Sequence, residues 1–411
     1  MKRKILILYL FILFFFFTGV ISRSYADTAQ VVPKGAVSVW TEGIFYFDFH
    51  EKFNEHGNTQ DIAKDYNANL NSNVFTGLRQ IESIFHLPSG SASIGNSVVS
   101  FKYGGEEFNS LLMYGLTDRL TIGVRIPFYW RRNEVKAVLD TLKATVGKNV
   151  ALNTLAPLSV PGTVPLTTQD VQNLLGKGLD IGTTHIPGYG YTPVGPWSDQ
   201  GVGDIEVGGK YQYLSTDKWQ LAFTGGVRFP TGEVDNPNNL VDVGFGNGVY
   251  ALLFQSQNDF IGFKNLRLNG TLRYDLNLPD HVTLRVPDSV HQPITMNEEN
   301  VYREIGAKIE AEISGKYDFF NGFSFQLLYK YGYKFHDHVT GNMGYNYKSL
   351  EDETNYQEHM GIASLWYSTV PLYQAKKFPI PMMAIFSYRD RFAGTNLFKT
   401  QYLSLTLAIY L

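Results

Sequence analysis

Apolar and polar residues alternate one for one along most of the chain after residue 37. In residues 266–277 (LRLNGTLRYDLN), leucine, glycine and tyrosine fall on one face, while arginine, asparagine, threonine and aspartate fall on the other. Residues 305–317 (IGAKIEAEISGKY) and 323–335 (FSFQLLYKYGYKF) keep the same period of two. Alternation over about ten residues predicts a strand with one apolar and one wet face.

These segments pair into hairpins whose two ends differ in length. Turns such as LTDR (116–119) and STDK (215–218) are short, whereas the longest connection runs from 131 to 201. Such sorting is typical of outer-membrane barrels, which have short periplasmic turns and long outer loops. The sequence therefore predicts an all-β fold, an antiparallel up-and-down transmembrane β-barrel of about twelve strands. Their expected starts are near Val37, Phe108, Leu120, Val202, Gln220, Gly248, Asn265, Val301, Phe323, Glu358, Met382 and Gln401.

Three segments fit this pattern less well. Residues 74–103 have room for another hairpin, which leaves fourteen strands open. Residues 356–368 carry apolar side chains on both faces. Arg303 falls on the lipid side of its expected strand, a position that it tolerates only at the outer rim.

A nearly repeated phrase, GVRIPF at 123–128 and GVRFPT at 226–231, places an arginine between apolar residues. Alternation directs Arg125 and Arg228 into the lumen, because an arginine on the lipid face at mid-depth costs roughly 2–4 kcal/mol. A slip of one residue would impose that cost, so the phrase also fixes the register. The proline two positions after each arginine is expected to end strand pairing.

The composition agrees with a membrane barrel. Of 411 residues, 15% are aromatic and 39 are glycine, while the hydrophobic share of 44% is ordinary. A net charge of −3 gives no reason to expect a nucleic-acid partner. The chain has no cysteine, which excludes disulfides, thiol catalysis and cysteine metal sites.

The first residues predict export. MKRK precedes an apolar run, and Ser24-Tyr25-Ala26 supplies small residues before a cleavage point. Residues 1–26 are therefore expected to be a signal peptide and 27–411 the barrel, with an uncleaved anchor as the alternative. The predicted location is the outer membrane of a Gram-negative-type bacterium. The expected partners are outer-membrane lipid, periplasmic chaperones and the barrel-assembly machinery.

The predicted lumen carries charges of both signs. This mixture favours neither a cation-selective nor an anion-selective pore. Two interpretations stay open: a salt-bridge network that stiffens a narrow barrel, and a ladder of groups that contact a solute. Loops or the N-terminal segment could also close a barrel of this bore. The residues expected to face inward are Arg125, Lys210, Arg228, Arg273, Lys308, Lys330 and Arg389, with Glu42, Asp204, Glu206, Asp275, Glu310 and Glu312.

The 131–201 connection is expected to be an extracellular loop with two short helices. Helical spacing of apolar residues occurs over 135–146 and again over 168–175, where Thr168 offers a start and Gly176 a stop. One hypothesis is that these helices cap the outer mouth and give apolar molecules a landing surface; the alternative is a loop that packs on itself. The apolar residues of this expected gate are Val135, Leu139, Leu142, Val171, Leu174 and Leu175.

Three segments in order carry a resemblance to a known family: YGLTDRLTIGVRIPF, GVGDIEVGGKYQYL and GVRFPTGEVDNPNNLVDVGFGNG. They resemble the outer-membrane family of the meta-pathway of phenol degradation, over residues 106–411 apart from the long loop. Proteins of that family are distantly similar to fatty-acid and aromatic-hydrocarbon channels. The resemblance implies passive uptake of small hydrophobic or aromatic solutes and carries over no binding residues.

Three other classes of protein were weighed against a channel. The nine histidines are scattered, so we expect no enzyme and no cofactor. The HDH triplet at 336–338 could hold a metal, although solvated loop residues explain it as well. A structural or adhesive barrel with a sealed lumen stays open as the main alternative. A soluble periplasmic β-protein is disfavoured, because the aromatic face of 323–335 would be exposed to water.

Overall fold

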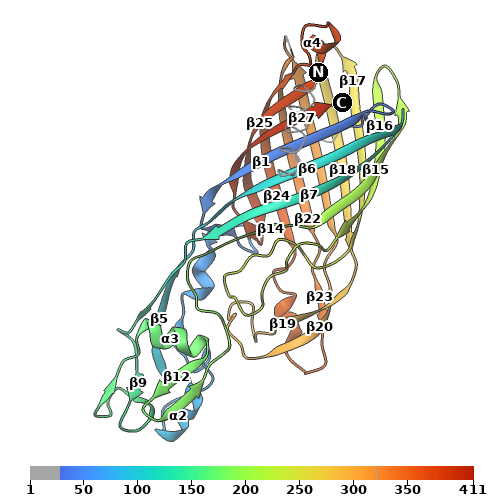
Figure 1. Cartoon of the computed structure of the whole chain (residues 1–411). Helices are drawn as coiled ribbons and strands as arrows, with labels where there is room; N and C mark the ends of the chain where they lie inside the picture. Colours follow the sequence, from blue (N-terminus) through green and yellow to red (C-terminus); the bar gives the residue numbers. More distant parts are fainter. Residues whose placement is uncertain (1–27, 321) are drawn as a thin grey trace, which may run out of the picture.

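The computed structural model of the chain describes residues 28–320 and 322–411. Twelve of the described strands form one closed antiparallel ring (Figure 1). The predicted fold class is confirmed, and the signal peptide expected at 1–26 lies outside the described residues. The barrel strands are β1 (Val37–Phe49), β6 (Tyr103–Thr117), β7 (Leu120–Asn133), β15 (Ile205–Ser215), β16 (Trp219–Phe229), β17 (Ala251–Phe263), β18 (Leu266–Asn277), β21 (Lys308–Asp318), β22 (Phe323–Lys334), β24 (Tyr356–Ser368), β25 (Met382–Thr395) and β27 (Gln401–Tyr410).

Pairing of neighbouring strands closes the sheet without a free edge. The last strand, β27, pairs with both β25 and β1, and β1 continues through β6 to β7. The start of β1 and the C-terminus lie at the end of the barrel that carries the short turns and the helix α4 (Val370–Gln374) (Figure 1). By the usual rule for such barrels this end is periplasmic, and the long connections lie outside the cell.

The strands alternate as the sequence predicts. In β18, Leu272 is 53% exposed on the outer wall, whereas its neighbour Arg273 is 6% exposed in the lumen. Residues 356–368 also resolve into two faces, because Met360, Ile362 and Trp366 are buried inside the ring. The lumen therefore has an apolar sector, formed by two clusters of inward side chains on β1, β22, β24, β25 and β27.

Beyond the outer end, residues 54–102 and 134–196 build a separate body, which we call the outer lobe (Figure 1). It has its own apolar core around Leu70, Phe75 and Ile94, so it is more than a set of loops. No helix in the described part of the chain is long and apolar enough to cross a membrane. The elements of the lobe are β3 (Thr59–Asp61), η1 (Ile62–Tyr66), β4 (Asn69–Asn71), α2 (Leu78–Ile84), β5 (Ser93–Ser100), β8 (Lys136–Asp140), β9 (Val146–Asn149), β10 (Thr154–Pro157), β11 (Thr163–Val164), α3 (Thr168–Leu175), β12 (Gly178–Ile181) and β13 (Thr184–Pro187).

Shorter elements surround the outer mouth. One sheet combines three strands from two connections, another fastens the start of the lobe to the barrel, and β14 extends the wall by pairing with the outer half of β7. These elements are β2 (Glu51–Phe53), β26 (Leu397–Phe398), β14 (Trp197–Val202), β19 (Asp280–Arg285), β20 (Glu298–Glu304), β23 (His338–Thr340) and η2 (Tyr347–Leu350).

Three sequence-based expectations are wrong. The helix expected over 135–146 is absent, because β8 occupies its centre and pairs with β5, placing Val138 opposite Val98. Residues 74–103 add no hairpin to the barrel; half of this segment forms α2 and β5 of the lobe. Arg303 lies in β20, beyond the barrel, where its guanidinium pairs with Asp280 at 2.8 Å. The second expected helix is confirmed as α3, with Thr167 as its N-cap.

Candidate functional site

The two copies of the repeated phrase lie on either side of a single strand, β15. In the sheet, Glu206 of β15 lies between Arg125 of β7 and Arg228 of β16. Its carboxylate accepts a hydrogen bond from Nε of Arg228 at 2.9 Å and lies 3.2 Å from Nη1 of Arg125. Each GVR therefore runs antiparallel to the EVG of residues 206–208, and the repeat places one arginine on each side of a shared acid.

The ion pairs continue around the lumen. Asp275 of β18 accepts a hydrogen bond from Nη2 of Arg228 at 2.7 Å. Arg273, two residues earlier, lies 3.5 Å from Glu312 and 3.8 Å from Glu310 of β21. Opposite charges thus face one another on adjacent strands, or across β17 for Arg228 and Asp275, so the lining has no long one-signed stretch.

A second group of ion pairs centres on Lys330. Its ammonium lies 3.0 Å from Glu310 and 2.8 Å from Glu358, and Lys308 lies 2.8 Å from the same Glu310. Arg391 completes the group at 2.7 Å from Glu358. Alternation predicted the inward direction of Lys308, Glu310 and Lys330. Arg391 and Glu358 were missed, although they have the same parity as the inward residues Arg389 and Met360 on their strands.

Asp204 stands apart from these ion pairs. It lies in the break between β14 and β15, and its two carboxylate oxygens accept hydrogen bonds from the backbone N–H groups of Gly232 and Asn247, each at 3.0 Å. The connection 230–250 is further attached to the wall by Trp197, whose Nε1 donates to the carbonyl of Val241 at 2.6 Å. Asp204 therefore holds the loop that follows the second GVR phrase.

Replacing Asp204 by alanine is expected to loosen that loop. Two partly buried N–H groups would lose a charged acceptor, at a cost of about 1–3 kcal/mol. Amide hydrogen exchange of residues 230–250 should accelerate while exchange in the barrel strands stays unchanged. Asp199→Ala is the matched control, because that carboxylate is exposed and accepts only from the N–H of Gln200. Equal exchange in the two variants would contradict the role of Asp204.

The first described residues run inside the barrel. Asp259 of β17 accepts hydrogen bonds from the hydroxyl of Thr28 at 2.7 Å and the N–H of Ala29 at 3.1 Å. Lys210 donates to the carbonyl of Thr28, and Gln212 donates to that of Ala29, both at 3.0 Å. The segment 28–33, which we call the N-terminal strap, thus occupies the periplasmic part of the lumen.

Above the strap lies a lumenal cavity of about 410 Å³. Gly123, Gly208 and Gly226 sit side by side in its wall, so three adjacent strands contribute no side chain there. Apolar side chains form much of the remaining wall, and the sequence reasoning missed them because it selected charged positions only. These apolar residues include Trp40, Leu111, Met113, Leu253, Trp366 and Met383. Of the residues expected to face inward, Arg125, Glu206, Lys210, Arg273 and Asp275 line it.

Gly208→Ala is expected to destabilise the barrel by about 1–3 kcal/mol, as overpacking does in a close-packed region. A Cβ at this position would lie 2.9 Å from the carbonyl oxygen of Gly225, which belongs to the backbone and cannot turn aside. Gly209→Ala is the control, because its nearest atom would be 3.6 Å away. Urea unfolding of the detergent-solubilised protein measures both. Equal unfolding midpoints for the two variants would show that the glycine row, formed by Gly123, Gly208 and Gly226, tolerates a side chain.

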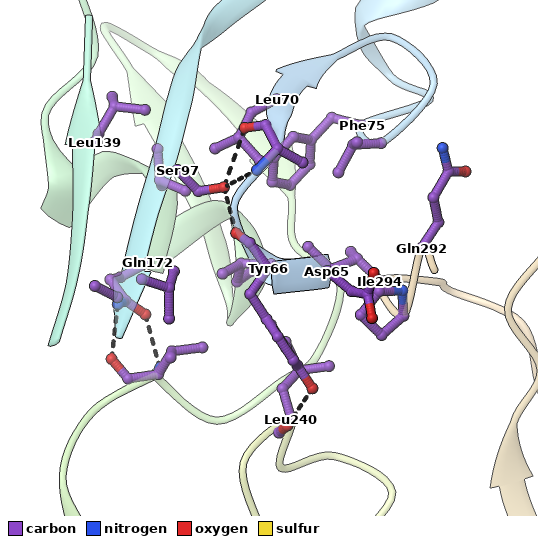
Figure 2. A pocket seen from close by; sticks show the side chains of 18 of the residues that line it. Asp65, Tyr66, Leu70, Phe75, Ser97, Leu139, Gln172, Leu240, Gln292 and Ile294 are labelled. Carbon is purple, nitrogen blue, oxygen red and sulfur yellow. Dashed lines mark hydrogen bonds between the residues drawn. The ribbon is translucent and has the colours of Figure 1, made fainter. Parts of the chain in front are cut away.

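The residues of the expected gate do not form one continuous surface. Val135 packs with Phe101, Tyr103 and Val241 between the lobe and the barrel, and Leu142 is 91% exposed. The others belong to the lobe: Leu174 lies in its core, while Leu139, Val171 and Leu175 also border an apolar depression, which we call the lobe pocket (Figure 2).

Two ionisable groups of the lobe have shifted pKa values. Burial raises the pKa of Tyr66 to about 12, so its hydroxyl stays a neutral donor. Burial also opposes ionisation of Asp170 in α3, but hydrogen bonds from Lys148 and Thr167 outweigh it and lower the pKa of Asp170. Asp170 accepts from Nζ of Lys148 at 2.9 Å and closes the capping box of α3, so the helix that borders the pocket is firmly anchored.

Within residues 28–411, leaving out 321, no cluster of three or more histidines and acids is placed to bind a metal. His338 of the HDH triplet pairs with Glu351 at 2.8 Å, and His336 faces the carbonyl of the same residue.

Comparisons with known proteins agree with the architecture. An outer membrane channel from Pseudomonas putida F1 matches with a TM-score of 0.54 over 95% of this chain and 100% of that one, at 12% identity. A FadL homologue of Pseudomonas aeruginosa gives a TM-score of 0.35 at 9% identity, over 92% of this chain and 90% of that one. The toluene transporter TbuX of Ralstonia pickettii gives 0.33 at 9% identity, over 93% and 92%. The first match supports the fold; the other two scores are too low to carry an argument.

The chain therefore has the barrel fold of an outer-membrane channel. No protein-family model matches it, and no curated protein sequence matches it either. The resemblance to the family of the phenol meta-pathway stays a prediction.

Proposed function

We propose that the protein is an outer-membrane channel for passive uptake of small hydrophobic or aromatic molecules. The observation that carries this is the lumenal cavity, which combines apolar side chains with charges that are already paired. A solute in it meets Trp40, Leu111 and Met113 on one side. Because Arg125 and Glu206 pair with each other, an ionic solute would have to displace a protein partner. The shared fold of the channel from Pseudomonas putida F1 supports the same class of function.

In this proposal the protein lies in the outer membrane of a Gram-negative-type bacterium, with lipid around the barrel. A signal peptide would bring the chain to periplasmic chaperones and the barrel-assembly machinery, as for other barrels. The inward charges act mainly as a structural network, and the solute contacts the apolar wall and the glycine row.

Uptake can be tested by filling the cavity. Met113→Trp adds bulk to the lumenal cavity, and its neighbour Leu112→Trp adds the same bulk to the outer wall, where Leu112 is 49% exposed. Bacteria that lack other hydrocarbon channels and express the chain should accumulate labelled toluene faster than cells without it. Met113→Trp should abolish that gain, and Leu112→Trp should keep it. Equal uptake by the two variants would contradict the proposal.

A sealed structural barrel is the second candidate, and the N-terminal strap favours it. Four hydrogen bonds, two accepted by Asp259 and two donated by Lys210 and Gln212, hold the strap inside the lumen. A large outer lobe on a closed barrel would serve display or adhesion. Toluene uptake that never exceeds that of cells without the chain would support this candidate.

A further inference from the structure

The lobe pocket lies between the β4–β5–β8 sheet, η1, α3 and the segment 291–294, which belongs to a different connection of the barrel (Figure 2). It offers about 90 Å³ to a small molecule within a depression of about 800 Å³ that is partly open to solvent. A cavity of roughly 150 Å³ suffices to bind benzene in another protein. The enclosed part of the lobe pocket is smaller than that cavity, so a single ring or a short alkyl chain would lie partly inside it and partly in the open depression.

Three polar side chains of the lobe pocket are already committed to the backbone. Ser97 donates to the carbonyl of Tyr66 at 2.6 Å, and the hydroxyl of Tyr66 donates to the carbonyl of Leu240 at 2.8 Å (Figure 2). The amide of Gln172 both donates to and accepts from the backbone of Val194, each at 2.9 Å. A polar ligand would have to break these bonds, whereas an apolar ligand leaves them intact.

The charge at the edge of the pocket disfavours anions. Among the described residues that line it, Asp65 is the one acid, and lysine and arginine are absent. Asp65 lies 3.3 Å from His291, which also lies 3.7 Å from Glu353, so a second carboxylate stands close by. Lys52 lies 3.7 Å from Asp65 and 3.6 Å from Glu353 and already neutralises one of them. A carboxylate ligand would gain no free cation and would meet an acid.

A continuous row of aromatic rings leads from the lobe pocket to the barrel. Tyr66 lines the pocket and contacts Phe101 with 4.9 Å between ring centres, and Phe101 contacts Tyr103 of β6 at 6.0 Å. Tyr103 stacks on Phe398 of β26 at 5.7 Å and on Phe49 of β1 at 5.9 Å. These rings belong to a largely buried cluster that joins the lobe to the outer end of the barrel, so the pocket is fixed in position relative to the mouth of the lumen.

From these observations we infer that the lobe pocket is a binding site for an uncharged apolar molecule with a single aromatic ring or a short alkyl chain. It captures such a molecule outside the cell and rejects the corresponding carboxylate. The binding rests on the pocket alone, while its role in supplying the lumen rests on the proposed function.

Fluorine NMR of fluorobenzene tests this, with the full chain in lipid nanodiscs. Ala137→Phe places a ring in the pocket, whereas Val98→Phe places the same ring on the opposite face of the same sheet, outside the pocket lining. The two variants share the same partition of probe into lipid, so their difference reports the pocket. We expect wild type and Val98→Phe to broaden the fluorobenzene signal alike. Ala137→Phe should bind about tenfold more weakly, which corresponds to about 1.4 kcal/mol.

Two further measurements keep the result decisive. Gln292→Trp covers the entrance from an exposed position, so it should weaken binding without disturbing the lobe core. The probe 4-fluorobenzoate should bind at least tenfold more weakly than fluorobenzene to wild type. Equal binding of fluorobenzene to Ala137→Phe and Val98→Phe, or of the two probes to wild type, would overturn the inference.

The outcome is separable from that of the channel proposal. Binding lost in Ala137→Phe while Met113→Trp leaves toluene uptake unchanged would keep the site and remove the channel. Uptake blocked by Met113→Trp while Ala137→Phe binds normally would keep the channel and remove the site.

Discussion

Replacing Arg389 by methionine is expected to destabilise the folded barrel by about 3–5 kcal/mol, the cost of leaving a buried charge without its partner. Arg389 of β25 lies 2.5 Å from Glu42 of β1, and both side chains are fully buried. β27 lies between these two strands, so the pair braces the barrel across its last strand, near the closure of the ring. The midpoint of urea unfolding and the temperature at which the folded band disappears from a gel measure the loss.

Two controls separate the ion pair from simple loss of an arginine. Arg267→Met removes a lumenal arginine that is 31% exposed and lies 4.0 Å from Asp259, so it should cost far less. The double variant Glu42→Leu with Arg389→Met removes both charges and should recover most of the stability, because no uncompensated charge is left. A single variant as stable as Arg267→Met would show that Glu42 finds another way to be satisfied.

The barrel was predictable because its membrane setting enforces a simple rule. Every second side chain meets lipid, so one row such as Leu268, Leu272 and Tyr274 reveals the strand, its facing and its limits. The expected strand starts at residues 37, 120, 323, 382 and 401 agree with the structure. The prediction fails outside the membrane, where the alternation rule does not apply. The expected barrel strand near Val301 is β20, which lies beyond the barrel, and the barrel strand itself begins at Lys308.

The lobe was less predictable because its local patterns are ambiguous. Residues 135–146 have apolar side chains at helical spacing, but the exposed edge of β5 offers backbone partners that a helix would leave unused. In α3 the local signal was stronger, since Thr167 and Asp170 form a capping box that needs no distant partner. A local cap can be predicted from sequence, whereas pairing with a segment about 40 positions away cannot.

The pairing of side chains in the lumen was also not predictable from the sequence. Alternation directs Arg125, Glu206 and Arg228 inward, but only the register shows that the acid lies between the two arginines. The apolar wall of the cavity was missed because Met113 and Trp366 look in sequence like any other apolar strand residue. The strap was foreseen only as one of several ways to close the barrel, because its bonds to Lys210 and Asp259 span about half the chain.

Removing residues 28–33 is expected to raise the single-channel conductance of the protein several-fold. The strap fills the periplasmic part of the lumen and lines the floor of the lumenal cavity. Its backbone is held by Asp259, Lys210 and Gln212, which would all point into an open passage without it. Planar-bilayer recordings in potassium chloride measure the effect, on protein whose fold is verified by heat-dependent gel mobility.

The control deletes residues 376–378, in the exposed turn that follows α4 at the same end of the barrel. It shortens the periplasmic surface without touching the lumen, so its conductance should equal that of wild type. A strap deletion with unchanged conductance would place the barrier in the ion pairs of the lumen or in the loops over the outer mouth. Because the ion pairs bridge the strands on both sides of β15, such a barrier could not be removed without weakening the wall, and the sealed structural barrel would then be the better description.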